Sequence, residues 1–109
     1  MLASSQAFAL TNFKCEVSEN VSPPLQERSV KYVLTAQLNS NSQAGIDVDG
    51  KILDLKYGFE TFRDSEGKQV VLVGANTNGQ DSVAYGENSA SLFYDVANSG
   101  ELFAHCFVE

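Results

Sequence analysis

The sequence predicts an all-β fold, a small antiparallel β-sandwich or barrel of about eight or nine short strands. Apolar and polar residues alternate in segments that recur roughly every ten residues, as expected of half-buried strands. Clusters of Gly, Asn, Ser and Pro separate these segments and favour turns. The chain shows no sustained helical periodicity, and its 109 residues suffice for one hydrophobic core but not for two.

The first strand is expected over residues 10–18 and the second over residues 29–38. The pair Pro23–Pro24 lies between them, where the missing backbone N–H groups exclude a central strand. The first strand places three apolar residues on one face, Phe13, Cys15 and Val17. The second strand places five on one face, Val30, Tyr32, Leu34, Ala36 and Leu38. Both strands are therefore predicted to turn one face toward the core.

A tight hairpin is expected over residues 46–53, after a polar loop. The pair Asp49–Gly50 is flanked by apolar residues and would supply the positive φ angles of a type I′ turn. The second arm is predicted to continue over residues 52–57. Gly58 is expected to interrupt it as a bulge or bend before the strand resumes over residues 59–63.

Asp64–Gly67 is expected to form a second tight turn that leads into a strand over residues 68–74. Because Val70–Val73 is continuously apolar, this strand is predicted to be central and covered on both faces. Two further short strands are expected over residues 82–85 and 90–96.

The last strand, over residues 101–108, has an aliphatic face that carries Cys106 and an aromatic face. Cys15 and Cys106 are the two cysteines of the chain, and their spacing fits neither a zinc site nor a Cys-x-x-Cys redox motif. The alternative to a disulfide is two separate buried thiols. Since both cysteines fall on inward faces of the terminal strands, the sequence favours a disulfide between them.

The charge balance excludes some partners. Fourteen acidic residues against seven basic ones give a net charge of −7, and no two basic residues are adjacent. A nucleic-acid-binding face, which needs clustered cations, is therefore not expected. The chain also lacks a run of about 18 apolar residues, so no transmembrane segment is predicted.

The N-terminal residues and the cysteines both favour export. Residues 1–9 end in the triplet Ala7–Ala9, which has the small-x-small form of a signal-peptidase cleavage site. Cysteines that pair in a disulfide are typical of an oxidising compartment. The sequence therefore predicts a periplasmic or extracellular protein. Residues 1–9 would be the remnant of an export signal or a disordered N-terminus, and residues 10–109 a single β-domain.

No catalytic centre is predicted. His105 is the single histidine, and on a strand it points away from the face that carries its neighbour Cys106. The two side chains therefore cannot form a Cys-His pair. No serine lies in a Gly-x-Ser-x-Gly motif, and no cofactor motif is present. The sequence thus predicts a non-enzymatic protein without a cofactor.

Asp47, Asp49 and Asp54 are weak candidates for a calcium site, because Asp-x-Asp-Gly places two carboxylates close together. The EF-hand pattern needs Gly at its sixth position and Glu at its twelfth, and neither follows Asp47 at that distance. The hairpin explains the same residues without a metal, so none is predicted.

Aromatic residues give the strongest indication of a binding surface. Phe103, His105 and Phe107 share one face of the last strand, and Phe93 comes from the strand before it. If Leu102 and its neighbours point inward, these four are exposed together, and contiguous exposed aromatics mark partner sites. The alternative is that the two faces are reversed or that another segment covers the patch.

One resemblance bears on the function. The chain resembles the small periplasmic inhibitors of C-type lysozyme in two features. It has one cysteine in the first strand and one in the last, and it contains the segment Ser82–Gly86 (Ser-Val-Ala-Tyr-Gly). The chain departs from that family because it has no Trp and no Lys after Lys68. The resemblance implies inhibition of a basic secreted enzyme.

Taken with the composition, these features predict an exported, acidic, non-enzymatic module that binds a macromolecular partner, expected to be a protein and basic. The alternatives are a small carrier of a lipid or sugar and a structural subunit of an envelope or surface assembly.

Overall fold

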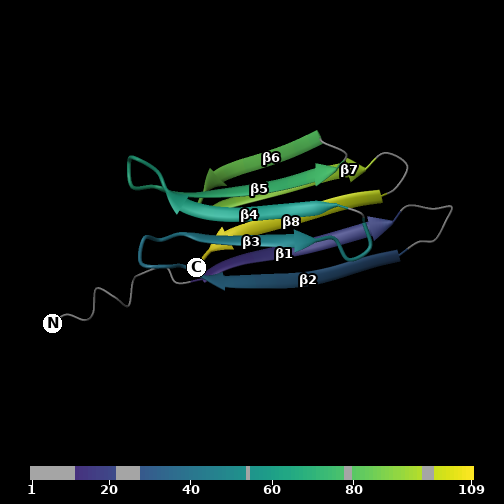
Figure 1. Ribbon diagram of the computed structural model, residues 1–109, viewed down its shortest axis with the longest axis horizontal. Helices are drawn as coiled ribbons and strands as arrows, with labels where there is room; N and C mark the ends of the chain where they lie inside the picture. The colour runs from purple at the N-terminus through teal and green to yellow at the C-terminus, as the bar shows by residue number, and fades with distance from the viewer. Residues whose placement is uncertain (1–11, 22–27, 54, 78–79, 97–99) are drawn as a thin grey trace.

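The computed structural model describes residues 12–21, 28–53, 55–77, 80–96 and 100–109 (Figure 1). They form eight β-strands, which confirms the predicted all-β class and strand number. The strands are β1 (Asn12–Val21), β2 (Arg28–Gln37), β3 (Ala44–Asp49), β4 (Lys56–Arg63), β5 (Gln69–Thr77), β6 (Gln80–Glu87), β7 (Ser89–Val96) and β8 (Gly100–Val108).

The strands are arranged in two antiparallel sheets of four strands each, so the fold is a sandwich and not a closed barrel (Figure 1). Sheet A has the order β2-β1-β8-β7, and sheet B has the order β3-β4-β5-β6. The first and last strands therefore lie side by side in the middle of sheet A, with register partners from Phe13–Val108 to Val21–Gly100.

Two connections carry the chain from one sheet to the other. Between β2 and β3, the side-chain carboxamide oxygen of Asn39 accepts hydrogen bonds from the backbone N–H groups of Asn41 and Gln43. This is how Asn commonly stabilises a turn. Between β6 and β7, Asn88 has a φ of 67°, a left-handed conformation that Asn tolerates better than most residues.

The core between the sheets includes the residues that were predicted to face inward on the first and last strands, together with residues of β4, β5, β7 and the β3–β4 connection. Its buried apolar members are Phe13, Cys15, Val17, Leu53, Leu55, Tyr57, Phe59, Val71, Val73, Ala75, Ala90, Leu92, Leu102, Ala104 and Cys106. The inward residues of the edge strand β2, such as Tyr32 and Leu34, pack against this core but are only half-buried. Burial of these side chains is the main source of the sandwich's stability.

The predicted disulfide is present. Cys15 and Cys106 are direct register partners in β1 and β8, their Cα atoms are 4.0 Å apart, and both side chains are fully buried. The crosslink joins neighbouring strands of one sheet across a sequence separation of 91 residues. It therefore closes nearly the whole domain into one loop.

The hairpin predicted at Asp49–Gly50 is wrong. The partner of Asp49 is Lys56, so the connection between β3 and β4 runs through residues 50–55. Gly50 does not have a positive φ, as a type I′ turn requires. Leu53 and Leu55 are buried in the core, which the short turn would not allow.

Two other local expectations were also wrong. Gly58 does not interrupt its strand, since β4 pairs without a bulge on both sides of it. Strand β5 lies in the interior of sheet B, as predicted, but only Val71 and Val73 face the core; Val70 and Leu72 lie half-buried on the outer face.

The turn predicted at Asp64–Gly67 is confirmed. Gly67 has a φ of 81°, and its N–H donates to the carbonyl of Asp64. The Asp64 carboxylate accepts from the N–H groups of Glu66 and Lys68.

The expected export-signal remnant, residues 1–9, lies outside the residues that the structure describes. Among those it does describe, there is no helix with the length and apolar character needed to cross a membrane.

Candidate functional site

The outer face of sheet A carries the residues that the sequence singled out for partner binding. Phe93 of β7 and Phe103 of β8 are direct register partners, and His105 and Phe107 follow Phe103 along β8 on the same face. Val33 of the edge strand β2 also points outward. We call this surface, made of Val33, Phe93, Phe103, His105 and Phe107, the aromatic face.

The aromatic face is open to solvent. Phe93 is 61% exposed, Phe103 44% and Val33 55%. His105 and Phe107 are half-buried, and their rings lie 5.5 Å apart, centroid to centroid. No described strand covers this side of sheet A, so the inward and outward faces are as predicted.

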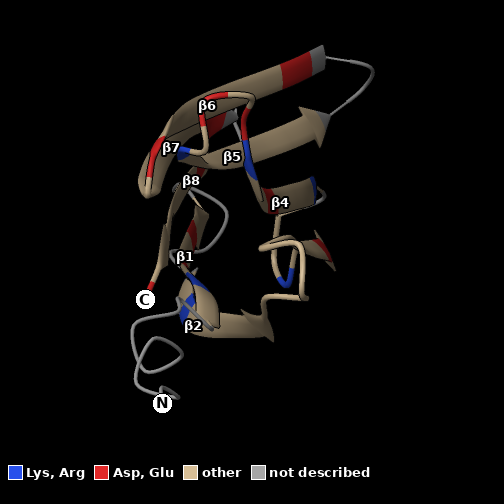
Figure 2. Cartoon of the chain, turned by 90° about the vertical axis from the view of Figure 1, so that its left-hand side faces the viewer, with Lys and Arg blue, Asp and Glu red and all other residues tan. Residues whose placement is uncertain are grey.

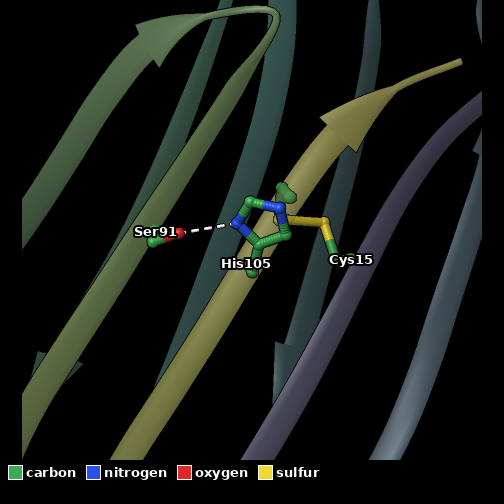
Figure 3. The surroundings of a disulfide bond; sticks show 4 residues. Cys15, Ser91 and His105 are labelled. Atoms are coloured by element: carbon green, nitrogen blue, oxygen red, sulfur yellow. Dashed lines mark hydrogen bonds between the residues drawn. A yellow bond between two sulfur atoms is a disulfide. The ribbon is translucent and has the colours of Figure 1, made fainter.

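His105 makes a contact that sequence reasoning did not find. Its Nδ1 atom is 2.6 Å from the hydroxyl oxygen of Ser91, the residue opposite it on β7 (Figure 3). In Ser-His-Asp centres the serine contacts Nε2 and the acid contacts Nδ1. Here the serine contacts Nδ1, the nitrogen that the acid contacts in those centres. As predicted, Cys106 is on the opposite side of β8 from His105.

Three acidic residues lie next to the aromatic face. Asp95 and Glu101 are both exposed and lie directly opposite each other on β7 and β8, two residues along each strand from the Phe93–Phe103 pair and on the same face. Like charges directly opposite each other destabilise a strand pair. Glu16, also exposed, lies in register between Val33 and His105. Acidic residues also occur on other strands of both sheets, as Figure 2 shows. A cationic partner would relieve the repulsion between Asp95 and Glu101.

Two of the three weak metal candidates lie on one strand, and the third is not described. Asp47 and Asp49 lie on the exposed side of β3, and Asp54 is outside the described residues. Within the described ranges, no three Asp, Glu, His or Cys side chains are grouped as metal ligands.

A buried carboxylate lies on the inner side of sheet A, and the sequence analysis missed it. Glu19 of β1 is fully buried. It accepts hydrogen bonds from three successive backbone N–H groups of the β3–β4 connection, those of Lys51, Ile52 and Leu53, at 2.9–3.0 Å. The hydroxyl of Tyr32 on β2 donates to the same carboxylate. Glu19 thus ties sheet A to a loop of sheet B.

The environment of Glu19 favours its ionised form. Burial alone raises the pKa of this carboxyl, but the hydrogen bonds from the backbone N–H groups and from Tyr32 outweigh burial, and the net pKa lies below its usual value. Burial is the main cause that raises the pKa values of Tyr32 and Tyr57. The next cause is the hydrogen bond to Glu19 for Tyr32 and the negative charge of Glu19 for Tyr57. The buried Tyr57 hydroxyl has no hydrogen-bond partner within the described part of the chain.

A signal for this buried carboxylate was present in the sequence. Phe13, Cys15 and Val17 alternate on the inward face, and the same alternation continued by two residues places Glu19 there. The predicted strand ends at Ser18, one residue before Glu19, whereas β1 extends to Val21.

Gly50 is required by this arrangement, which yields a first testable expectation. An added Cβ would lie 2.2 Å from the carbonyl oxygen of Leu53, 3.0 Å from the Tyr57 hydroxyl and 3.2 Å from the Glu19 carboxylate. Gly50→Ala is therefore expected to lower the free energy of unfolding by about 1–3 kcal/mol, measured by urea denaturation. At Gly58 the nearest atom, on Asp47, is 3.6 Å away. Gly58→Ala should change stability by less than about 0.5 kcal/mol, and equal effects of the two substitutions would contradict this account.

Comparison with protein-family models, with curated proteins and with solved structures gives no match for this chain.

Proposed function

We propose that this chain is an exported, non-enzymatic binding module that engages a basic protein partner through the aromatic face. The observation that carries the proposal is the exposed Phe93–Phe103 pair, which continues through His105 and Phe107. Interface centres are enriched in aromatic residues, and exposed apolar patches of this kind mark interaction sites.

The charge pattern supports a basic partner. The chain has a net charge of −7, and Glu16, Asp95 and Glu101 border the aromatic face. Complementary charge raises the rate of association and aligns the partner more than it adds affinity. An inhibitor of a cationic secreted enzyme is one protein of this kind. The disulfide is compatible with an oxidising, exported location.

The alternatives receive less support. A lipid or sugar carrier needs an enclosed apolar cavity. In the described sandwich, side chains from both sheets meet in the core, and the hollows around it are open at the surface. A Ser-His catalytic pair of the usual kind would place the serine at Nε2 of the histidine, whereas Ser91 contacts Nδ1 of His105.

Site-specific photo-crosslinking tests the proposal. A photo-crosslinking phenylalanine analogue placed at position 93 is expected to form a discrete adduct with a basic protein in cells that export the chain. The same analogue at position 85 is the matched control, because Tyr85 is 77% exposed on the outer face of sheet B. Phe103→Ser should reduce the position-93 adduct about fivefold or more, while Val83→Ser should not.

Three outcomes would contradict the proposal. The first is the absence of an adduct from position 93, and the second is an adduct that Phe103→Ser leaves unchanged. The third is an adduct with a second copy of the chain, which would favour the assembly alternative. Unfolding curves of both serine variants serve as the folding control, since Val83 and Phe103 are both exposed.

A further inference from the structure

An open hollow lies beside Phe103 on the outer face of sheet A. Its volume is about 480 Å³, and the outward residues that line it are Glu16, Ser18, Lys31, Val33 and Phe103. Ser18 lies in register between Lys31 and Phe103, and its small side chain leaves the space open between larger neighbours. The hollow is therefore formed by the strand register itself and not by a loop.

The hollow combines a carboxylate with an aromatic ring and an aliphatic wall. The register neighbours of Glu16 are Val33 on one side and His105 on the other. Neither ion pair of the described residues includes Glu16; the nearby Lys14 pairs with Glu109. Phe103 and Val33 present exposed apolar surface to the same space.

Resting on the proposed function, we infer that this hollow receives an arginine side chain of the partner. A guanidinium group is planar, so it stacks on an aromatic ring such as Phe103 while its edge pairs with a carboxylate such as Glu16. The aliphatic part of the same side chain packs on Val33. A lysine can supply the charge but neither the planar stacking nor the paired hydrogen bonds.

Removal of the charge of Lys31 is expected to change arginine binding in the opposite direction from removal of the charge of Glu16. Lys31 lines the hollow and carries the same charge as the expected ligand. The positive charge of Lys31 is exceeded by the three negative charges around Phe103, which are those of Glu16, Glu101 and Asp95. Removing the Lys31 charge should therefore strengthen arginine binding, whereas removing the charge of Glu16 should weaken it.

Titration of the isotope-labelled protein with capped Gly-Arg-Gly, followed by NMR, tests the inference. We expect saturable shifts confined to residues 16–18, 31–33 and 103, with capped Gly-Lys-Gly binding at least about threefold more weakly. Glu16→Gln and Phe103→Ala should each weaken binding about fivefold or more, and Lys31→Met should strengthen it. Glu60→Gln, which removes an exposed acid on sheet B, is the matched control and should change nothing.

Equal binding of the two peptides, shifts spread over the acidic surface, or full binding by Glu16→Gln would overturn the arginine inference. The proposed function is judged separately. If the position-93 adduct persists in Glu16→Gln, the aromatic face still binds a partner but not through this hollow. If that adduct is absent while the peptide binds as expected, the hollow stands and the proposed function fails.

Discussion

Removal of the disulfide by the double substitution Cys15→Ala and Cys106→Ala is expected to lower the free energy of unfolding by about 4–5 kcal/mol. The crosslink spans 91 residues, so its loss frees nearly the whole unfolded chain. Such a loss is a large share of the roughly 5–15 kcal/mol by which small domains are stable. The midpoint of thermal unfolding should fall by roughly 20 °C.

Urea denaturation at neutral pH measures this effect and its origin. If the disulfide acts through the unfolded chain, the variant should also expose more surface on unfolding, and the dependence of the unfolding free energy on urea should become steeper. Wild-type protein unfolded with a reductant present is the control and should match the double variant within about 1 kcal/mol. A double variant as stable as the oxidised protein would refute the proposed contribution.

The disulfide and the aromatic face could be predicted because both depend on simple alternation along β1 and β8. Cys15 and Cys106 fall on inward positions of strands that the pattern marks clearly, and Phe103, His105 and Phe107 fall on the opposite face of the second of these strands. Alternation fixes the face of each residue once the strand is identified. It does not by itself show which strands are neighbours, so Val33 was not associated with this face.

The connection between β3 and β4 could not be predicted because its structure depends on a residue about thirty positions away. Asp49–Gly50 carries the local signal of a tight turn. The buried Glu19 carboxylate instead accepts hydrogen bonds from the backbone N–H groups of residues 51–53. Leu53 and Leu55 are buried in the core. These long-range contacts outweigh the preference of the local pair. The contact between Ser91 and His105 was missed for a related reason, since it depends on the register of two strands.

Replacement of Glu19 by Gln is expected to lower the free energy of unfolding at neutral pH by about 2–3 kcal/mol. The amide keeps the size of the side chain but loses its charge, and its NH₂ group would face an N–H or O–H donor. Glu19→Leu should cost more, at least about 3 kcal/mol, because the N–H groups of Lys51, Ile52 and Leu53 would be left without an acceptor. Amide hydrogen exchange should show faster exchange of these three groups in both variants.

The contribution of Glu19 to the free energy of unfolding should decrease as the pH is lowered. The pKa of Glu19 in the folded protein is lowered, so the carboxylate contributes its full stability above the pKa of the unfolded chain, about 4.3. That contribution is lost as the pH falls through the lower pKa of the folded protein. The difference in unfolding free energy between wild type and Glu19→Gln should therefore be constant near neutral pH and shrink in acid.

Glu16→Gln is the matched control, because Glu16 lies on the same strand but is exposed on the outer face. The free energy of unfolding of Glu16→Gln should stay within about 0.5 kcal/mol of the wild-type value across the same pH range. A stability difference for Glu19→Gln that does not change with pH would mean that the ionised carboxylate is not what holds the β3–β4 connection. If both variants lose stability equally, general surface charge and not the buried carboxylate accounts for the acid sensitivity.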